Sequence, residues 1–260
     1  MSFIEQLKYR NELLFYFGLA NLIAAIVFLV LAYTTNNMLN GVNAWFKPFK
    51  FAASTVLYCW AVLWYCYYLK DFNIALFSWT IILTLGFEVA YIAFRAGRAE
   101  LSHFNTSTPL AGALFALMGI AATAITIYTG YVCVLFFANK FPQLPAYYVW
   151  AIRFGLLLFV VFALEGFVMG AAGSHTIGGS DDSQGIPVLN WSKKFGDLRI
   201  AHFIGMHALQ VLPLFSVYVL KNTKAVFLVA ALYGCLAVFT YVQASKGISL
   251  FKQHTKKVAG

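Results

Sequence analysis

Charged side chains are scarce in this chain of 260 residues: Asp, Glu, Lys and Arg make up 10% of it, against about 25% in ordinary soluble domains. Hydrophobic residues make up 62%, and the mean hydropathy is +0.77. This composition excludes a water-soluble globule. Seven membrane helices of about 20 residues would use roughly 140 positions, which leaves no room for a soluble catalytic or nucleic-acid-binding domain. The net charge of +9 is therefore interpreted as a signal of membrane topology.

Cysteine is also rare, and its placement excludes several kinds of site. All four cysteines fall inside apolar stretches and none has the spacing of a zinc or redox motif: Cys59, Cys66, Cys133 and Cys235. They are interpreted as small core residues. The chain has no P-loop, EF-hand or dinucleotide-binding motif. Its first apolar run lacks a cleavage site, so we expect that run to be retained as a membrane span.

Long apolar runs are what the sequence does contain. Seven of them have the length of a membrane helix, at residues 13–33, 48–69, 72–94, 109–137, 151–171, 200–220 and 225–244. The sequence therefore predicts an all-α fold, a polytopic bundle of seven transmembrane helices that forms one integral membrane domain over residues 1–260. No internal repeat of fixed period is visible.

Three local signals predict details of these helices. Thr108 before Pro109 predicts the start of the fourth helix, because a threonine N-cap often precedes a first-turn proline. Pro213 is expected to kink the sixth helix and to free a backbone carbonyl that another group must satisfy. Gly166 and Gly170 form a GxxxG pattern, which permits close helix approach.

The distribution of basic residues predicts the orientation. Seven of the eighteen Lys and Arg residues lie on the N-terminal side of the membrane and eleven on the other side. The positive-inside rule then places the N-terminus outside and the C-terminus in the cytoplasm, with a bacterial inner membrane as the expected location. The eleven are Lys47, Lys50, Arg95, Arg98, Lys193, Lys194, Arg199, Lys246, Lys252, Lys256 and Lys257. Four or five of them are candidates for a functional site instead.

Polar residues gather on the side that carries the longer connections. Glu88 and Glu165 lie near the ends of the third and fifth helices on that side, and His202, His207 and Gln210 lie where the sixth helix re-enters. An ionisable group at a helix centre costs about 2.5 to 3.5 kcal/mol, so such residues mark a functional site by default. The alternative is that they only hold helices together. We expect the third, fifth and sixth helices to adjoin, with Glu88, Glu165 and His207 directed inward.

The histidines are the candidate metal ligands, and only His254 in the C-terminal tail lies apart from them. His202 and His207 are five residues apart, which separates them by about 140° around a helix, so we expect different partners for each. The glycine-rich segment 175–185 either folds into the mouth of the bundle to present His175 with Asp181 or Asp182, or remains a solvent loop. Lys47 and Lys50, which flank Pro48, are expected on the same side as His103 and His175.

Three strings together resemble a family of uncharacterised bacterial multi-pass membrane proteins: RAELSHFNTSTP at residues 98–109, HTIGG at 175–179 and DLRIAHFIGMHALQ at 197–210. The resemblance covers roughly residues 43–215. It implies an integral membrane protein and no known activity.

These residues predict, first, a metal-dependent membrane enzyme that is hydrolytic or lipid-directed. Its divalent metal, zinc or iron, would be held by His103, His175, His202 and His207. Glu88 or Glu165 would act as ligand or general base, and Arg95, Arg98 or Arg199 would bind an anionic group of the substrate.

Two other classes remain open on the same residues. A proton-coupled transporter or channel would use the Glu and His side chains as a relay without a metal. A haem- or quinone-linked electron carrier is the third possibility. In each case the expected partners are membrane lipid and a small-molecule or lipid substrate, with no nucleic acid.

Overall fold

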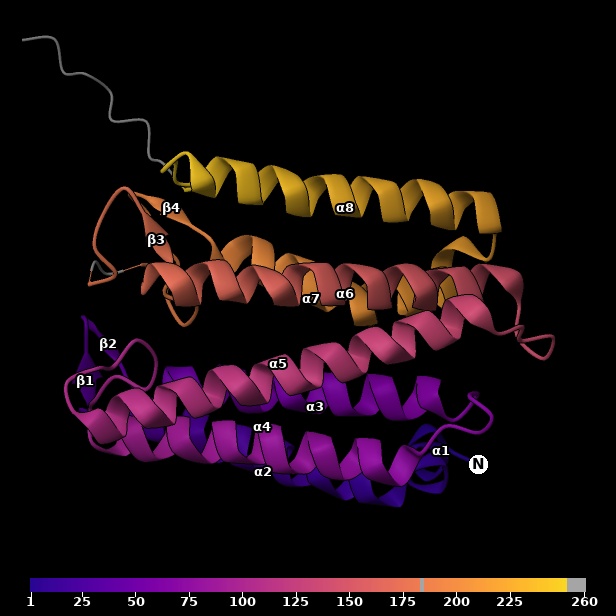
Figure 1. The fold of residues 1–260 in the computed structure, drawn as a ribbon, viewed down its shortest axis with the longest axis horizontal. Helices are drawn as coiled ribbons and strands as arrows, with labels where there is room; N and C mark the ends of the chain where they lie inside the picture. Colours follow the sequence, from indigo (N-terminus) through magenta and orange to yellow (C-terminus); the bar gives the residue numbers. More distant parts are fainter. Residues whose placement is uncertain (183–184, 252–260) are drawn as a thin grey trace, which may run out of the picture.

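The computed structural model describes residues 1–182 and 185–251. Within them, seven helices are long and apolar enough to span a membrane, which confirms the all-α seven-helix bundle (Figure 1). They are α2 (Glu12–Thr34), α3 (Phe46–Cys66), α4 (Ile74–Gly97), α5 (Pro109–Ala138), α6 (Ala146–Ala172), α7 (Arg199–Phe215), which continues as the π-helical segment η1 (Ser216–Leu220), and α8 (Thr223–Ser245). His254 and the lysines at 252, 256 and 257, used above to predict orientation, lie outside the described residues.

A short helix, α1 (Phe3–Arg10), precedes the first span and was not predicted. It begins with a capping box, in which Ser2 Oγ accepts a hydrogen bond from the Glu5 N–H and Glu5 Oε2 accepts one from the Ser2 N–H. At its other end the Arg10 guanidinium lies 3.7 Å from the centre of the Trp64 ring and donates to the Trp64 carbonyl. Arg10 thereby fastens α1 to the end of α3.

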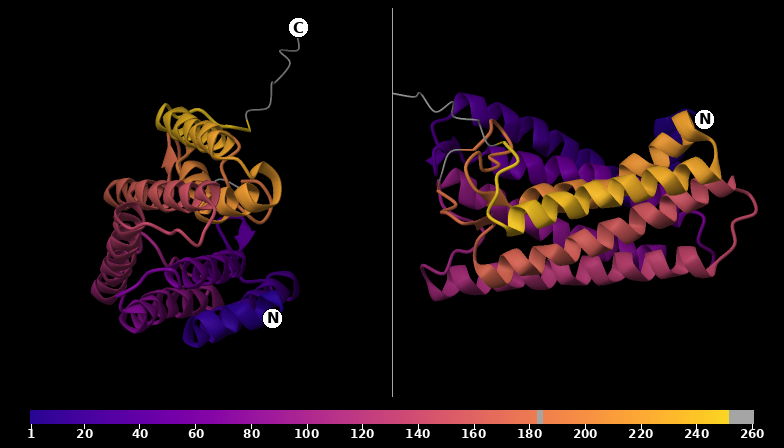
Figure 2. Two further views of the ribbon diagram at one scale, coloured as in Figure 1. Left: turned by 90° about the vertical axis from the view of Figure 1, so that its right-hand side faces the viewer. Right: turned by 90° about the horizontal axis from the view of Figure 1, so that it is seen from above.

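The spanning helices form two three-helix units that α5 joins. The first unit is α2, α3 and α4, the second is α6, α7 and α8, and α5 packs on α4 and α6 (Figures 1 and 2). In each unit the first two helices have the most extensive contacts and a two-stranded antiparallel hairpin separates them. The hairpins are β1 (Met38–Leu39) with β2 (Val42–Asn43), and β3 (Thr176–Ile177) with β4 (Gly196–Asp197). Because a single helix links them, the two units run through the membrane in the same direction.

The two units also correspond in the side chains that accept backbone hydrogen bonds at the start of their second helices, α3 and α7. Asn43 and Asp197 are the last residues of β2 and β4, and both are buried. Each accepts a hydrogen bond from the backbone N–H two residues later, at 3.0 Å from Trp45 and 3.1 Å from Arg199. The structure thus contains a repeat that no fixed period in the sequence revealed.

The two ends of the bundle differ in character. Both hairpins lie at the end away from the N-terminus (Figure 1), together with the connections at residues 35–45, 98–108 and 173–198; we call this the polar end. The opposite end, which we call the closed end, is filled by large apolar side chains from four helices. Leu63, Phe77, Phe136 and Leu156 are all 0% exposed there.

The predicted N-cap at Thr108 and the predicted free carbonyl before Pro213 are both confirmed, and α7 continues through Pro213 to Phe215. Thr108 Oγ1 accepts a hydrogen bond from the Ala111 N–H at the start of α5. Pro213 has no N–H to give to the Leu209 carbonyl, four residues earlier, and Tyr65 Oη donates to that oxygen at 2.8 Å instead. This hydrogen bond joins α3 of the first unit to α7 of the second.

The closest helix approach does not occur at the predicted GxxxG pattern. Nothing lies within 4 Å of where a Cβ on Gly170 would stand, and Gly166 faces the His202 ring. Gly155 is the glycine that α6 needs, because a Cβ there would lie 2.9 Å from the Ala208 carbonyl oxygen of α7. Close contact between α6 and α7 therefore depends on Gly155.

The predicted adjacency of three helices holds only in part. Helices α6 and α7 pack extensively on each other, but α4 packs on α2, α3 and α5. Glu88 therefore lies in the first unit and Glu165 in the second. Glu88 and Glu165 are buried, as predicted, with 8% and 7% exposed. His207 is half-buried against the Phe203 ring.

Candidate functional site

Charged and imidazole side chains from both units meet at the polar end. Lys47 and Lys50 come from the first turn of α3, Arg199 is the first residue of α7, and the others come from the connections. The charge of Lys47 acts on His103 and His175, so the predicted placement of Lys47 on their side of the membrane is confirmed. We call the group the interface cluster; it consists of Lys47, Lys50, His103, His175, Asp181, Asp197 and Arg199.

Asp197 anchors the interface cluster. Its side chain is 0% exposed and accepts hydrogen bonds from Arg199 Nε at 2.9 Å and Arg199 Nη2 at 2.6 Å, in bidentate geometry. Its two oxygens also accept from the backbone N–H groups of Ser192 and Arg199. The charge of Arg199 is therefore compensated within the protein.

The two lysines lack such compensation. Lys50 Nζ donates to the Leu189 carbonyl at 2.9 Å, and among the described residues no carboxylate lies within ion-pair distance of it. Lys47 Nζ has neither a hydrogen-bond acceptor nor an ion-pair partner in that part of the chain, although Lys50, Arg199 and Asp181 are near enough to act on its charge. Asp197 likewise acts on the charge of Lys50 from beyond ion-pair distance. The cluster thus has an excess of positive charge, which suits it to an anion.

His175 and Asp181 form an oriented pair. His175 Nδ1 lies 3.2 Å from Asp181 Oδ1 and 3.1 Å from Thr176 Oγ1. The hydrogen bond of Nδ1 is with the Thr176 hydroxyl, and Asp181 lies within ion-pair distance. A proton on Nδ1 would face Asp181, which can only accept, and would leave Nε2 as a free base. Burial lowers the pKa of His175 to about 4; Arg199 adds to this shift, and Asp197 and Asp181 oppose it.

The neighbours of His175 also have shifted pKa values. Burial, reinforced by Lys47 and His175, holds the pKa of His103 well below its ordinary value. Burial opposes ionisation of Asp181, but hydrogen bonds from Thr176, Ser174 and the His175 backbone N–H, together with the nearby His175 ring, lower the pKa of Asp181. Both imidazoles are therefore neutral and Asp181 is charged near pH 7.

The neutral imidazoles predict acid sensitivity. A histidine with a depressed pKa takes up its proton more readily in the unfolded chain, so stability is full above about pH 6.5 and falls as the pH drops toward 4. For His175 the loss is on the order of 3 kcal/mol across this window. We expect His175→Gln to flatten the pH dependence of the unfolding free energy in detergent between pH 7 and 4. An unchanged slope in the variant would contradict this assignment.

The predicted metal group is not formed by these side chains. His103 and His175 lie in connections, whereas His202 and His207 lie on α7. His202 Nδ1 is 2.6 Å from the Phe162 carbonyl, so it is used in a contact between α6 and α7. Within residues 1–182 and 185–251 no group of three or more His, Cys, Asp or Glu side chains is placed to hold a metal ion. The described residues therefore do not show the predicted metal group, and zinc or iron stays a prediction.

The predicted catalytic residues are distributed over several places. Arg199 belongs to the interface cluster. Glu165 is near enough to Asp197 for their charges to interact, and both of its buried carboxylate oxygens lack a hydrogen-bond partner among the described residues. Glu88, buried in α4, likewise has no hydrogen bond or ion pair in the described part of the chain. Arg95 and Arg98 both pair with Glu100, outside the cluster.

Sequence reasoning assigned Lys47 and Lys50 to topology and not to the site. A usable signal existed, because both lie inside the first turn of α3 and not in the preceding connection. Sequence reasoning gave Asp197 no role in the site, because that role depends on β4, which is two residues long. Such short strands leave no periodic pattern to detect.

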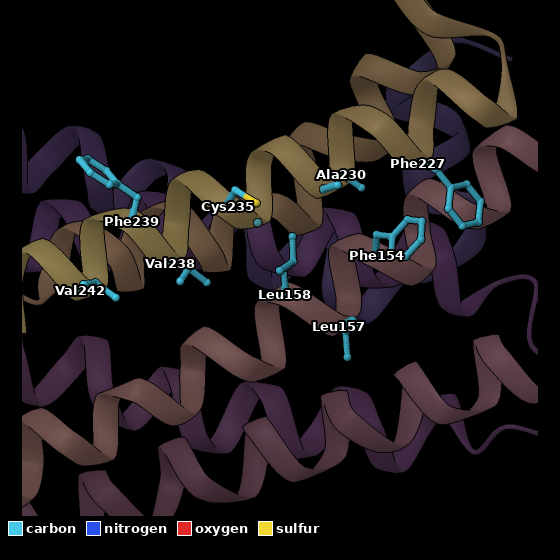
Figure 3. A pocket seen from close by; sticks show the side chains of 11 residues that line it. Phe154, Leu157, Leu158, Phe227, Ala230, Cys235, Val238, Phe239 and Val242 are labelled. Atoms are coloured by element: carbon cyan, nitrogen blue, oxygen red, sulfur yellow. The ribbon is translucent and has the colours of Figure 1, made fainter.

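An apolar groove lies between α6 and α8. This groove of about 800 Å³ is lined by side chains such as Phe154, Leu158, Phe227, Val238 and Phe239 (Figure 3). Cys235 is its one lining residue with an ionisable side chain. None of the interface cluster residues lines this groove.

No protein family, curated protein or solved structure matches this chain. The resemblance to the uncharacterised bacterial membrane proteins therefore stays a prediction, and function is argued from the site.

Proposed function

We propose that this chain is a membrane transporter for an anionic solute, which binds at the interface cluster between the two units. One observation carries the proposal: Lys47 and Lys50 bring positive charge to the junction of the units without carboxylate partners among the described residues. A bound anion would supply the missing compensation through charge-assisted hydrogen bonds.

The arrangement of the helices supports transport over chemistry on a fixed scaffold. Many transporters are built from repeats that run parallel or inverted, bind substrate where the repeats meet, and rock one repeat against the other. Here α2–α4 and α6–α8 correspond element by element, and the cluster lies between them at the polar end. Apolar side chains and the Tyr65–Leu209 hydrogen bond occlude the closed end.

Glu165 is the residue that we propose couples transport to protons. A buried carboxyl group without a donor is costly in a membrane interior. Glu165 has this setting and lies within electrostatic reach of Asp197. Asp197 is in turn within electrostatic reach of Lys50 on α3 of the first unit. Movement of the units against each other would change the charge beside Asp197, and proton exchange at Glu165 would follow that movement.

A membrane enzyme is the second candidate, and the His175–Asp181 pair favours it. An imidazole with a carboxylate beside its Nδ1, as Asp181 lies beside His175, is a common arrangement for a general base. Such an enzyme would act on an anionic small molecule or lipid and would be hydrolytic or lipid-directed. Among the described residues no group of three or more His, Cys, Asp or Glu side chains converges on one point, so this candidate rests on His175 and Asp181.

Replacing Lys47 tests the anion site. In purified protein we expect inorganic phosphate, sulfate, acetate or citrate to raise the melting temperature, and Lys47→Gln to weaken the effective anion about 10-fold to 100-fold, as expected for the loss of a hydrogen bond to a charged group. Lys224→Gln, on the exposed start of α8 at the closed end, is the matched control. Equal anion affinity in Lys47→Gln and wild type would contradict the site.

We also propose that the polar end faces the cytoplasm of a bacterial inner membrane, as the positive-inside rule suggests. Cysteine labelling from each side of the membrane at residues 193 and 221, which lie in connections at opposite ends, distinguishes the two orientations.

A further inference from the structure

A separate polar pocket lies where α4 ends and α5 begins, at the polar end of the bundle. It has a volume of about 540 Å³, and none of the interface cluster residues lines it. The side chains that matter are Arg95, Arg98 and Glu100, with Ser107 and Thr108 on the rim. Its position at the ends of two spanning helices places it at the membrane–water interface.

The charges in this pocket do not cancel. Arg95 is largely enclosed. It donates through Nη1 to the Glu100 carboxylate at 2.5 Å and through Nε to the Leu101 carbonyl. Arg98 is 59% exposed and reaches Glu100 through Nε alone, at 3.0 Å. Two guanidinium groups therefore share one carboxylate, and the Arg98 Nη1 and Nη2 atoms have no acceptor among the described residues.

Arg98 is not required to finish α4. The last carbonyls of that helix, on Ala96 and Gly97, accept hydrogen bonds from Asn37 Nδ2 at 3.1 and 2.9 Å. Thr108 Oγ1 accepts from the Ala111 N–H, which leaves its own proton for another acceptor. The pocket therefore offers the free edge of a guanidinium and a hydroxyl donor to a ligand.

The surroundings indicate what kind of ligand fits. Phe94 of α4 and Leu110 of α5, adjacent in sequence to the pocket residues, are 60% and 68% exposed. Apolar surface thus accompanies the pocket toward the membrane interior, while its rim is polar. A ligand with an anionic head and hydrocarbon tails matches both parts, and basic pockets between membrane helices commonly bind such head groups.

We propose that this pocket binds the phosphate group of an anionic phospholipid. Arg98 holds two phosphate oxygens through Nη1 and Nη2, Thr108 donates its hydroxyl proton, and the acyl chains lie against Phe94 and Leu110. Arg95 is a positioning residue: because it also pairs with Glu100, the single carboxylate does not neutralise the charge of Arg98 completely. The site is independent of transport at the interface cluster.

Lipid retention tests the assignment. Protein purified in a neutral detergent is analysed by native mass spectrometry and by melting temperature, with phosphatidylglycerol, phosphatidylcholine and inorganic phosphate added separately. We expect wild type to retain phosphatidylglycerol and to be stabilised by it, with little response to phosphatidylcholine. Arg98→Gln should bind phosphatidylglycerol at least 5-fold more weakly, and the control Lys224→Gln should bind it as wild type does.

Two results would overturn the proposal. Equal retention by Arg98→Gln and wild type would show that the pocket is not the binding site. Stabilisation by inorganic phosphate equal to that by phosphatidylglycerol, and lost in Arg98→Gln, would assign a soluble phosphate instead of a lipid. The melting temperature of each lipid-free variant establishes that Arg98→Gln is folded, as expected for an exposed side chain.

Discussion

Glu165→Gln is expected to abolish proton movement coupled to anion uptake while leaving anion binding intact. The amide keeps the shape of the side chain but cannot exchange a proton, and Glu165 lies in α6, apart from the lysines that would hold the anion. In proteoliposomes that contain a pH-sensitive dye, an imposed gradient of the anion that stabilises wild type should change the internal pH. The variant should show no change above protein-free vesicles.

Glu88→Gln serves as the matched control, because Glu88 is buried to the same degree in the first unit. We expect it to retain coupling. If Glu165→Gln moved protons at the wild-type rate, the assignment of Glu165 would be wrong. Loss of coupling in both variants would mean that the relay spans both units.

Asp197→Asn is expected to be the most destabilising single charge change in the connections. It leaves Arg199 without its bidentate partner, and removing one member of a buried ion pair costs roughly 3 to 5 kcal/mol. Because the Arg199 side chain keeps 26% exposure, we expect a loss of about 3 kcal/mol, near the lower bound. The backbone cap to the Arg199 N–H should survive, since Asn43 forms the same cap in the first unit.

The measurement for Asp197→Asn is the free energy of unfolding in mixed micelles at neutral pH. Asp182→Asn is the control, because Asp182 is exposed and, among residues 1–182 and 185–251, its carboxylate accepts a hydrogen bond from Ser180 alone. A change of less than 0.5 kcal/mol is expected there. Equal effects of the two substitutions would show that burial of Asp197 contributes nothing to stability.

The spans could be predicted because membrane insertion depends on summed apolarity, which is visible along the chain. Local rules also succeeded at Thr108 and Pro213, since each acts on backbone groups within four residues. The division into two units could not be predicted. It depends on which helix faces pack, and helices such as α6 and α8 are apolar all round, so no face is marked in advance.

The histidines led the sequence interpretation toward a metal because four of them fall on one side of the membrane. Lying on the same side of the membrane does not bring side chains together, however. His202 contacts the Phe162 carbonyl, whereas His175 lies beside Asp181. For Lys47 and Lys50 the sequence pointed away from the site. Lys47 and Lys50 fit the positive-inside rule, so their second role emerged only when α7 and the connection at 173–198 were placed beside them.

The central claim, that an anion bound between the two units crosses the membrane, is tested most directly by counterflow. Proteoliposomes are loaded with an excess of the unlabelled anion that stabilises wild type and diluted into medium with a trace of the labelled anion. The account predicts transient accumulation of label by wild type and Lys224→Gln, and none by Lys47→Gln. Binding without accumulation in wild type would contradict a transporter and favour the enzyme built on His175 and Asp181.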